Sequence, residues 1–350
     1  MLFKAYPGLE GHIPWVSLVN APTPVSRLEK LSVDLGRDIW IKRDDLTSAD
    51  YGGNKPRKLE FLLAEAGTQN KKTLVTAGGL GTNHGLATAI MGRKLGFQVR
   101  LGLFEQPVTG QVLKHLRLFK AFGAEMKLCG RFFEDTVEDC LGEEMNHPEV
   151  YFIPLGGSNA LGTLGFVNAS LELAEQVKKG RMPLPEAIFV AAGTCSSFAG
   201  LLLGTHLAGL DTKVIGVRVT PEDTSNPDRV MEFIQGAGEL MRRHDPAVPE
   251  RPITRDDVLL DHDQLGDGYA HVTGAGQAAL EAMARRQSIR LDLTYTAKTL
   301  AALLNFVRTG PGRGPLLFWN TYNSVDLSAV ADKVDHRSLP REFHRFFEPV

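Results

Sequence analysis

The sequence has little cysteine, no long apolar run and no basic leader. Its cysteines, Cys129, Cys140 and Cys195, are odd in number and lack C-x-x-C spacing, so they predict neither a disulfide framework nor a zinc site. No segment approaches the ~18 uninterrupted apolar residues of a membrane span, and residues 1–19 lack the pattern of a secretory signal. We therefore expect a cytoplasmic protein in a reducing compartment.

The sequence also lacks an excess of charge of either sign. Its 39 basic and 41 acidic side chains leave a net charge of −2, which provides no whole-chain attraction to nucleic acid or to an anionic membrane. The hydrophobic content of 43% and the charged content of 23% are those of a globular protein. A chain of 350 residues is long enough for about two domains. The expected partner is a small molecule.

Apolar, β-branched segments alternate with longer helical patterns, which is typical of an α/β fold with parallel sheets covered on both faces. The expected strands are Asp38–Lys42, Thr73–Ala77, Val99–Phe104, Glu125–Cys129, Tyr151–Pro154, Ala187–Ala192, Lys213–Val219 and Pro315–Trp319. The expected helices are Pro56–Thr68, His84–Leu95, Gly110–Phe122, Phe132–Met145, Leu161–Lys179, Phe198–Ala208, Gly274–Gln287 and Thr296–Arg308. Breaker residues predict loops at Thr220–Asp228 and Arg243–Asp257.

Glycine is in excess, at 36 of 350 positions, and part of it lies in three loops at the starts of expected helices: Gly52–Lys58, Gly78–His84 and Gly193–Ser197. Each loop directs backbone N–H groups and the positive end of a helix dipole toward one point, which favours an anion. The dinucleotide fingerprint G-x-G-x-x-G and the P-loop motif are both missing. The hydroxyl groups of the third loop suit a single phosphate monoester, so the pattern predicts a phosphorylated cofactor.

Lys55 stands behind a Gly-Gly-Asn turn in which Asn54 is a plausible N-cap, at the start of one expected helix. Lys58 follows three residues later on the same face. The helix dipole and the second ammonium both disfavour the protonated amine of Lys55. We expect a lowered pKa and a neutral amine that can attack a carbonyl, which is the chemistry of a Schiff-base lysine.

With these residues, the chain resembles the pyridoxal-phosphate enzymes of the tryptophan-synthase β-like fold, or fold type II. Within this family, the chain resembles the branch that contains D-cysteine desulfhydrase, 1-aminocyclopropane-1-carboxylate deaminase and L-cysteate sulfo-lyase. The resemblance runs from about Pro22 to Leu327 and rests on motifs in the family's order: Ile41–Asp45, Gly52–Lys55, Arg57–Leu62, Thr82–His84, Gly156–Gly162, Ala199–Leu201 and Tyr295–Lys298. The stretch Gly156–Gly162 looks most like the D-cysteine desulfhydrases.

The resemblance implies an α/β fold of two three-layer α/β/α domains with open, twisted, mostly parallel sheets. It implies a large cofactor-binding domain of residues 1–57 and 166–350, with a smaller α/β domain of residues 58–165 inserted into it. It also implies a homodimer, pyridoxal 5'-phosphate as the cofactor and no metal ligands.

The resemblance also assigns roles to single residues. Lys55 would bind the cofactor through a Schiff base and take the substrate α-proton, with Tyr295 and Tyr269 as catalytic residues that relay a proton or orient the substrate. Asn83 would hydrogen-bond the cofactor ring hydroxyl. The substrate carboxylate would be bound by Thr82, Asn83 and His84, and the cofactor phosphate by Gly193, Thr194, Cys195, Ser196 and Ser197.

Thr296 follows Tyr295, where the cyclopropane deaminases have an acidic residue that pairs with the pyridine nitrogen. A hydroxyl from Thr296, or alternatively from Thr321, leaves that nitrogen largely neutral and the ring a weaker electron sink. Such a ring suits elimination of a good leaving group better than opening of a cyclopropane that has no α-proton. We expect α,β-elimination on a small, D-cysteine-like amino acid, giving pyruvate, ammonia and a leaving group such as sulfide.

Several positions depart from the family pattern. Larger side chains stand where the family has serine or glycine, at Thr82, Cys195, Ser196, Ala297, Tyr322 and Asn323. One methyl group shifts discrimination between substrates by about 1–3 kcal/mol, so these changes leave the amino acid and its stereochemistry open. 1-Aminocyclopropane-1-carboxylate deaminase and L-cysteate sulfo-lyase are alternative functions. A pyridoxal-phosphate-binding protein with little turnover, a racemase and a β-replacement synthase are further alternatives.

Overall fold

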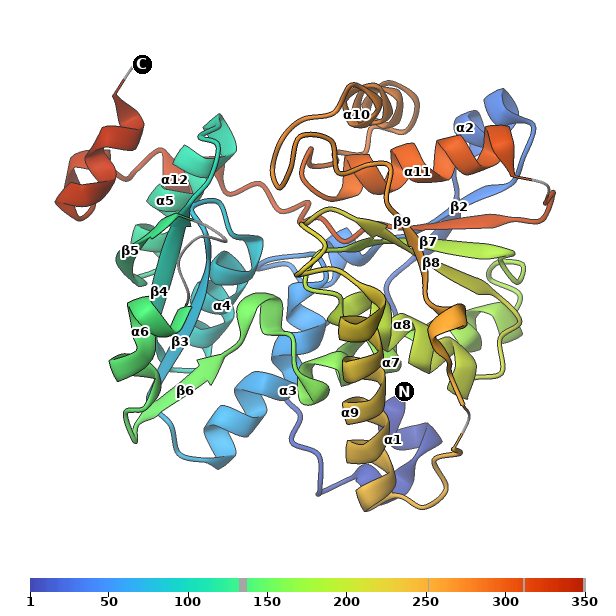
Figure 1. The fold of residues 1–350 in the computed structure, drawn as a ribbon, viewed down its shortest axis with the longest axis horizontal. Helices are drawn as coiled ribbons and strands as arrows, with labels where there is room; N and C mark the ends of the chain where they lie inside the picture. The colour runs from blue at the N-terminus through green and yellow to red at the C-terminus, as the bar shows by residue number, and fades with distance from the viewer. Residues whose placement is uncertain (132–136, 251, 311, 349–350) are drawn as a thin grey trace.

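The computed structural model describes residues 1–131, 137–250, 252–310 and 312–348, which form two sheets (Figure 1). The larger sheet has the strand order β1-β2-β10-β7-β8-β9, and only the β1–β2 pair is antiparallel among these described strands. Its strands are β1 (Val25–Arg27), β2 (Ile39–Lys42), β7 (Ala187–Ala192), β8 (Lys213–Arg218), β9 (Leu259–Asp261) and β10 (Leu316–Trp319).

Helices cover both faces of the larger sheet. α8 (Ser196–Leu207) packs on β7 and β8, with α7 (Ala160–Lys178) and α9 (Pro227–His244) next to it. α11 (Thr296–Thr309) lies on the opposite face with α10 (Gly274–Gln287), and α2 (Glu29–Leu35) contacts α10 (Figure 1). The strands between them are buried on both faces, as the almost continuous burial of β7 and β10 shows.

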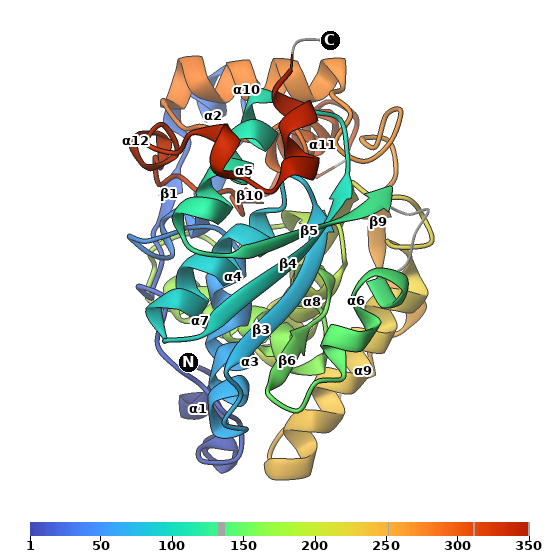
Figure 2. The ribbon, with the colours of Figure 1, turned by 90° about the vertical axis from the view of Figure 1, so that its left-hand side faces the viewer.

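The smaller sheet has the order β5-β4-β3-β6, and all its described strands are parallel. They are β3 (Thr73–Gly79), β4 (Gln98–Glu105), β5 (Glu125–Arg131) and β6 (Val150–Ile153). α4 (Asn83–Lys94) and α5 (Gly110–Ala121) cover one face and α6 (Val137–Met145) the other (Figure 2). α3 (Lys55–Thr68) packs against both α4 and α7 and so lies between the two sheets.

This architecture confirms the expected fold class of two α/β/α units with mostly parallel sheets. Each strand and helix expected from the sequence is present, although residues 132–136 of the expected helix Phe132–Met145 lie outside the described residues. The short edge strands β1 and β9 and the helices α1 (Leu2–Ala5), α2, α9 and α12 (Ser328–Ala331) were not expected. Pro227 occupies the first turn of α9 and Asn226 caps it, so two residues that indicated a loop in fact begin a helix.

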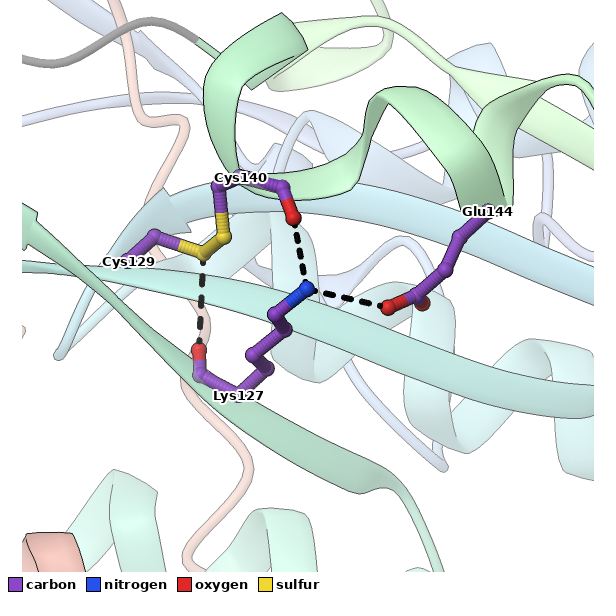
Figure 3. Close-up of a disulfide and its surroundings, with 4 residues drawn as sticks. All are labelled: Lys127, Cys129, Cys140 and Glu144. Carbon is purple, nitrogen blue, oxygen red and sulfur yellow. Dashed lines mark hydrogen bonds and ion pairs between the residues drawn. A yellow bond between two sulfur atoms is a disulfide. The ribbon is translucent and has the colours of Figure 1, made fainter.

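The structure contradicts the expectation that no disulfide forms. Cys129 of β5 and Cys140 of α6 are bonded, with Cα atoms 5.4 Å apart (Figure 3). The Lys127 ammonium donates to the Cys140 carbonyl at 2.6 Å and pairs with Glu144 at 3.3 Å, which holds the same helix against the same strand. The pairing depends on how α6 folds back onto the sheet, and cysteine spacing does not reveal that. Cysteine content therefore no longer supports a reducing compartment.

The chain returns to the smaller sheet after β10. α12 (Ser328–Ala331) packs on α5 (Figure 2). Lys114 of α5 pairs with Asp326 at 3.2 Å. Arg117 of α5 then lies over the ring of Phe347. The domain limits at residues 57 and 166 stay a prediction. In the described part of the chain, no helix has the length and apolar character needed to cross a bilayer.

Candidate active site

A cavity of about 500 Å³ lies between the two sheets, at the carboxyl ends of their parallel strands, which is where open α/β sheets bind ligands. It is lined by ten of the twelve residues assigned to the site from the sequence: Lys55, Thr82, Asn83, His84, Gly193, Thr194, Cys195, Ser197, Tyr269 and Tyr295. Ser196 and Thr296 are fully buried behind this lining. The three glycine loops thus converge on one site.

The turn before Lys55 requires its glycines. A Cβ atom on Gly52 would lie 1.9 Å from the Asp45 carbonyl oxygen, and one on Gly53 would lie 2.7 Å from the Thr321 carbonyl oxygen. Gly53 also has a φ of +95°, which L-residues with side chains rarely adopt. The turn is therefore clamped between backbone segments from the two neighbouring strands β2 and β10, and this clamp sets where Lys55 begins α3.

The Lys55 side chain is half-buried and lines the cavity, where burial lowers the pKa of its amine to about 8. No hydrogen bond or ion pair joins this amine to another residue in the part of the chain that the structure describes. The expected lowering is confirmed, but its cause is burial. Repulsion between the two lysines acts instead on Lys58, where it adds to burial and brings the pKa well below its ordinary value. A neutral amine without a protein partner is suited to nucleophilic attack.

A chain of hydroxyl groups lies at the start of α8. The Lys58 amine donates to Ser196 Oγ at 2.6 Å and to the Gly156 carbonyl at 3.0 Å. Ser196 Oγ donates to Ser158 Oγ at 2.9 Å, which lies 2.7 Å from Thr194 Oγ1. Together with the backbone N–H groups of the helix start, these groups form a positively polarised pocket that fits a phosphate.

Two residues, Asn54 of the first glycine loop and Cys195 of the third, behave differently from the expectation. Asn54 precedes α3 but makes no side-chain cap; its amide donates to Ser197 Oγ at 3.1 Å instead. Cys195 has a φ of +66°, the left-handed region that favours glycine. Its buried Sγ lies 3.2 Å from Ser225 Oγ, a contact that helps to retain the strained backbone.

The second loop ends at the start of α4. Thr82 caps this helix through Oγ1, which accepts from the Gly85 N–H at 3.2 Å, and its hydroxyl can still donate to a ligand. The Tyr51 hydroxyl donates to Asn83 Oδ1 at 3.1 Å. Since the carbonyl oxygen of Asn83 is occupied in this way, its amide N–H groups remain to donate into the cavity.

His84 presents a ring acceptor without a partner. Burial and the two nearby lysines keep the pKa of His84 well below 6.5, so the ring is neutral. Thr76 donates its hydroxyl proton to the Ile153 carbonyl at 2.7 Å, and it must therefore accept from His84 Nε2–H at 3.1 Å. His84 Nδ1 is consequently unprotonated, and it is a buried atom with no hydrogen-bond partner among the described residues.

Two tyrosines from separate loops meet in the lining of the cavity. The hydroxyl groups of Tyr269 and Tyr295 are 2.7 Å apart, and burial raises the pKa of both. The hydroxyl of Thr296, the next residue, is already hydrogen-bonded at the start of α11. It donates to Asp292 Oδ1 at 2.6 Å and accepts from the Asp292 N–H at 2.9 Å. Thr321, unlike Thr296, lines the cavity.

A buried ion network lies beneath the Lys55 turn. Arg57 donates to Asp44 Oδ1 at 2.7 Å and to Glu172 Oε2 at 3.1 Å, while Lys42 donates to Glu172 Oε1 at 2.5 Å. All four side chains are almost fully buried. Burial alone would raise the pKa of Glu172, but Arg57 and Lys42 lower it to about 2. The network joins β2, α3 and α7 next to Lys55.

Sequence reasoning missed the roles of Tyr51, Ser158 and Asp292, and it gave Lys58 only an effect on its neighbour. Three of these residues stand inside or beside motifs that were singled out: Tyr51 before Gly52, Lys58 after Lys55 and Ser158 within Gly156–Gly162. Asp292 lies in no such motif. Its carboxylate accepts from the N–H groups of residues 294–296 at the start of α11, and this pairing is visible only in the structure.

Comparison with known proteins agrees with this geometry. The family model described as pyridoxal-phosphate dependent enzyme matches residues 16–318. D-cysteine desulfhydrase of Serratia proteamaculans (strain 568) is 34% identical over 333 residues, covering 92% of this chain and 97% of that protein. D-cysteine desulfhydrase of Klebsiella pneumoniae (strain 342) is 34% identical, covering 90% of this chain and 96% of that protein. The crystal structure of an ACC deaminase homologue has a TM-score of 0.78 at 29% identity, and the match covers 95% of this chain and 97% of that one.

Proposed function

The chain belongs to the family of pyridoxal-phosphate-dependent enzymes, and we propose that it eliminates the β substituent of D-cysteine or a close relative. It is a lyase that uses pyridoxal 5'-phosphate. The overall reaction consumes water and gives pyruvate, ammonia and the leaving group, which is sulfide when the substrate is D-cysteine. The observation that carries this proposal is the partnerless amine of Lys55 in the cavity lining, set between the hydroxyl pocket of α8 and the start of α4.

The residues present fit the cofactor. The hydroxyl pocket and Lys58 supply donors for a phosphate, and a bound phosphate would itself favour the charged form of Lys58. The free Lys55 amine suits an aldehyde, and the Asn83 amide suits a ring hydroxyl. His84 Nδ1 is a buried acceptor with no hydrogen-bond partner among the described residues. A bound ligand with an N–H or O–H group would supply the missing hydrogen bond.

When bound, the cofactor supplies an electron sink for the bond that breaks at the substrate α-carbon. Lys55, once free of the cofactor, would take the α-proton, because its lowered pKa makes the neutral amine available near neutral pH. Tyr269 and Tyr295 stay protonated and share a short hydrogen bond, so a proton can pass between them and the leaving group.

The substrate carboxylate would bind at the start of α4. The Thr82 hydroxyl and the first backbone N–H groups of this helix are donors at its positive end. The His84 ring can only accept at Nδ1, so its expected contribution to the carboxylate is its backbone N–H. For the pyridine nitrogen we favour Thr321, since the Thr296 hydroxyl is engaged with Asp292.

The proposal is tested by release of ammonia and 2-oxo acid from D-cysteine, β-chloro-D-alanine, L-cysteate and 1-aminocyclopropane-1-carboxylate. We expect turnover of the first two. Turnover of 1-aminocyclopropane-1-carboxylate alone would contradict elimination. Turnover of L-cysteate alone would indicate an L-cysteate sulfo-lyase. If the cofactor is bound and no amino acid changes its absorption, the chain is a binding protein without turnover. A homodimer and a cytoplasmic location stay predictions.

Replacing Lys58 with glutamine is expected to weaken binding of pyridoxal phosphate by about 10- to 100-fold, since a charge-assisted hydrogen bond contributes about 1.5–3 kcal/mol. The reason is the position of its amine against the hydroxyls of the phosphate pocket, where a bound phosphate would favour the charged form. Titration of the apoprotein, followed by cofactor absorption, measures the change.

The matched control for Lys58→Gln is pyridoxal, which has the same ring and aldehyde but no phosphate. Its affinity should be nearly the same in the wild type and in the variant. An equal loss for both ligands would show that Lys58 supports the fold of the site instead of binding the phosphate.

A further inference from the structure

Tyr322 stands between the cavity and solvent. It follows β10, lines the cavity and is partly exposed. Its hydroxyl donates to Oε1 of Gln111 at 3.4 Å, and Gln111 is an exposed residue in the first turn of α5. The contact therefore reaches from the larger sheet to a helix of the smaller one, across the mouth of the cavity.

The direction of this contact follows from His115, which lies one turn further along α5. Burial lowers the pKa of His115 to about 4, so the ring is neutral and carries one proton. That proton is on Nδ1, because Nδ1 lies 2.9 Å from the Gly81 carbonyl, which can only accept. Nε2 must then accept from the Gln111 amide N–H at 3.0 Å. The amide oxygen of Gln111 is thereby turned toward Tyr322.

The same chain of contacts places Tyr322 at the substrate end of the cavity. Gly81 belongs to the loop that ends at Thr82, and the Gly81 N–H donates to Gln106 at 3.1 Å. The loop is thus held by α5 and by the end of β4, and Tyr322 is connected to it through Gln111 and His115. The hydroxyl pocket, by contrast, lies at the start of α8.

We propose that Tyr322 is a specificity-determining residue that limits the enzyme to amino acids with a small β substituent. The inference rests on the proposed function, whose substrate it narrows. A cavity of about 500 Å³ must contain the cofactor together with the substrate, and the phenol ring takes up space at the mouth where a longer β substituent would extend. The Gln111 contact keeps the ring in that place.

The test compares D-cysteine with S-benzyl-D-cysteine, which undergo the same elimination but release leaving groups of different size. In Tyr322→Ala, the ratio of kcat/KM for the benzyl compound to that for D-cysteine should rise at least about tenfold, the range that steric discrimination in a pocket reaches. Tyr322→Phe separates the ring from its hydroxyl: it keeps the bulk of the ring but loses the Gln111 contact, so its ratio should rise clearly less than that of Tyr322→Ala. Thermal unfolding checks that each variant is folded, and Tyr322→Leu replaces Tyr322→Ala if the latter is not.

A ratio that does not change when the ring is removed would overturn the inference. A second readout, the dissociation constant of each amino acid from the change in cofactor absorption, does not require turnover. If the wild type binds D-cysteine without eliminating it, the proposed function fails. The inference then stands if Tyr322→Ala tightens binding of the benzyl compound selectively, and it falls if both constants change equally.

Discussion

Lys55→Ala is expected to lower elimination activity by more than about 10³-fold and to remove the visible absorption band of the lysine–cofactor Schiff base. The physical reason is that Lys55 provides the one amine in the described cavity lining that is both partnerless and close to its neutral form, with a pKa of about 8. Absorption spectra of the purified variant and rates of pyruvate release measure the two effects.

Lys298→Met is the matched control for Lys55→Ala. Lys298 is also buried, and burial also lowers its pKa to about 8, but its ammonium donates to the Leu265 carbonyl outside the cavity lining. This variant should keep the absorption band and most of the activity, provided that circular dichroism shows it folded. If Lys55→Ala kept the band, another residue would be the Schiff-base lysine and the assignment would be wrong.

Glu172→Gln is expected to lower the free energy of unfolding by about 3–5 kcal/mol, because it leaves two buried cations with insufficient counter-charge. Lys42 and Arg57 both donate to this carboxylate, and Asp44 alone would remain opposite them. Denaturant unfolding of both proteins at neutral pH measures the difference. Because Arg57 is two residues from Lys55, the affinity for the cofactor should fall as well.

Glu175→Gln provides the comparison on the same helix. Glu175 is less buried and its ion pairs with Lys4 and Lys179 are long, at 4.0 and 3.7 Å, so its replacement should cost less than about 0.5 kcal/mol. An equal effect of the two substitutions would argue against the buried network as a source of stability.

The effect of Glu172 should also depend on pH. Its pKa of about 2 in the folded protein is below the ordinary value of 4.5, so the ionised carboxylate stabilises the folded state above about pH 4.5. That stability is lost as the pH falls through 4.5 toward 2. The difference in unfolding free energy between wild type and Glu172→Gln should therefore shrink over this interval, and a difference independent of pH would contradict the assignment.

Local patterns predicted most of the framework. β7 and β10 are continuous apolar runs because both of their faces are covered, so they were recognisable without a partner. Lys55 was recognisable because its turn needs two glycines that approach neighbouring backbone. By contrast, Asn226 and Pro227 form a helix start that has the same composition as a loop, which is why α9 was overlooked.

Contacts between distant segments explain the remaining differences. Tyr51 acts on Asn83 across 32 positions of sequence, and the Cys129–Cys140 pair depends on the packing of α6. The ring-nitrogen position was left between Thr296 and Thr321, because nothing in the sequence reveals that Asp292 engages the Thr296 hydroxyl. Such pairings require the three-dimensional arrangement, since each residue taken singly has an ordinary role in packing or capping.

The pairing of β2 with β10 affects how the enzyme is made. β2 is complete at residue 42, but its parallel neighbour ends at residue 319 of a 350-residue chain. The Asn54 N–H bonds the Thr321 carbonyl at 3.2 Å, and the Trp319 indole donates to Asp44 at 2.7 Å. During synthesis on a ribosome, the turn that carries Lys55 therefore cannot reach its final shape until residues 316–321 have been made. A truncated translation product would contain the lysine without a properly formed site around it.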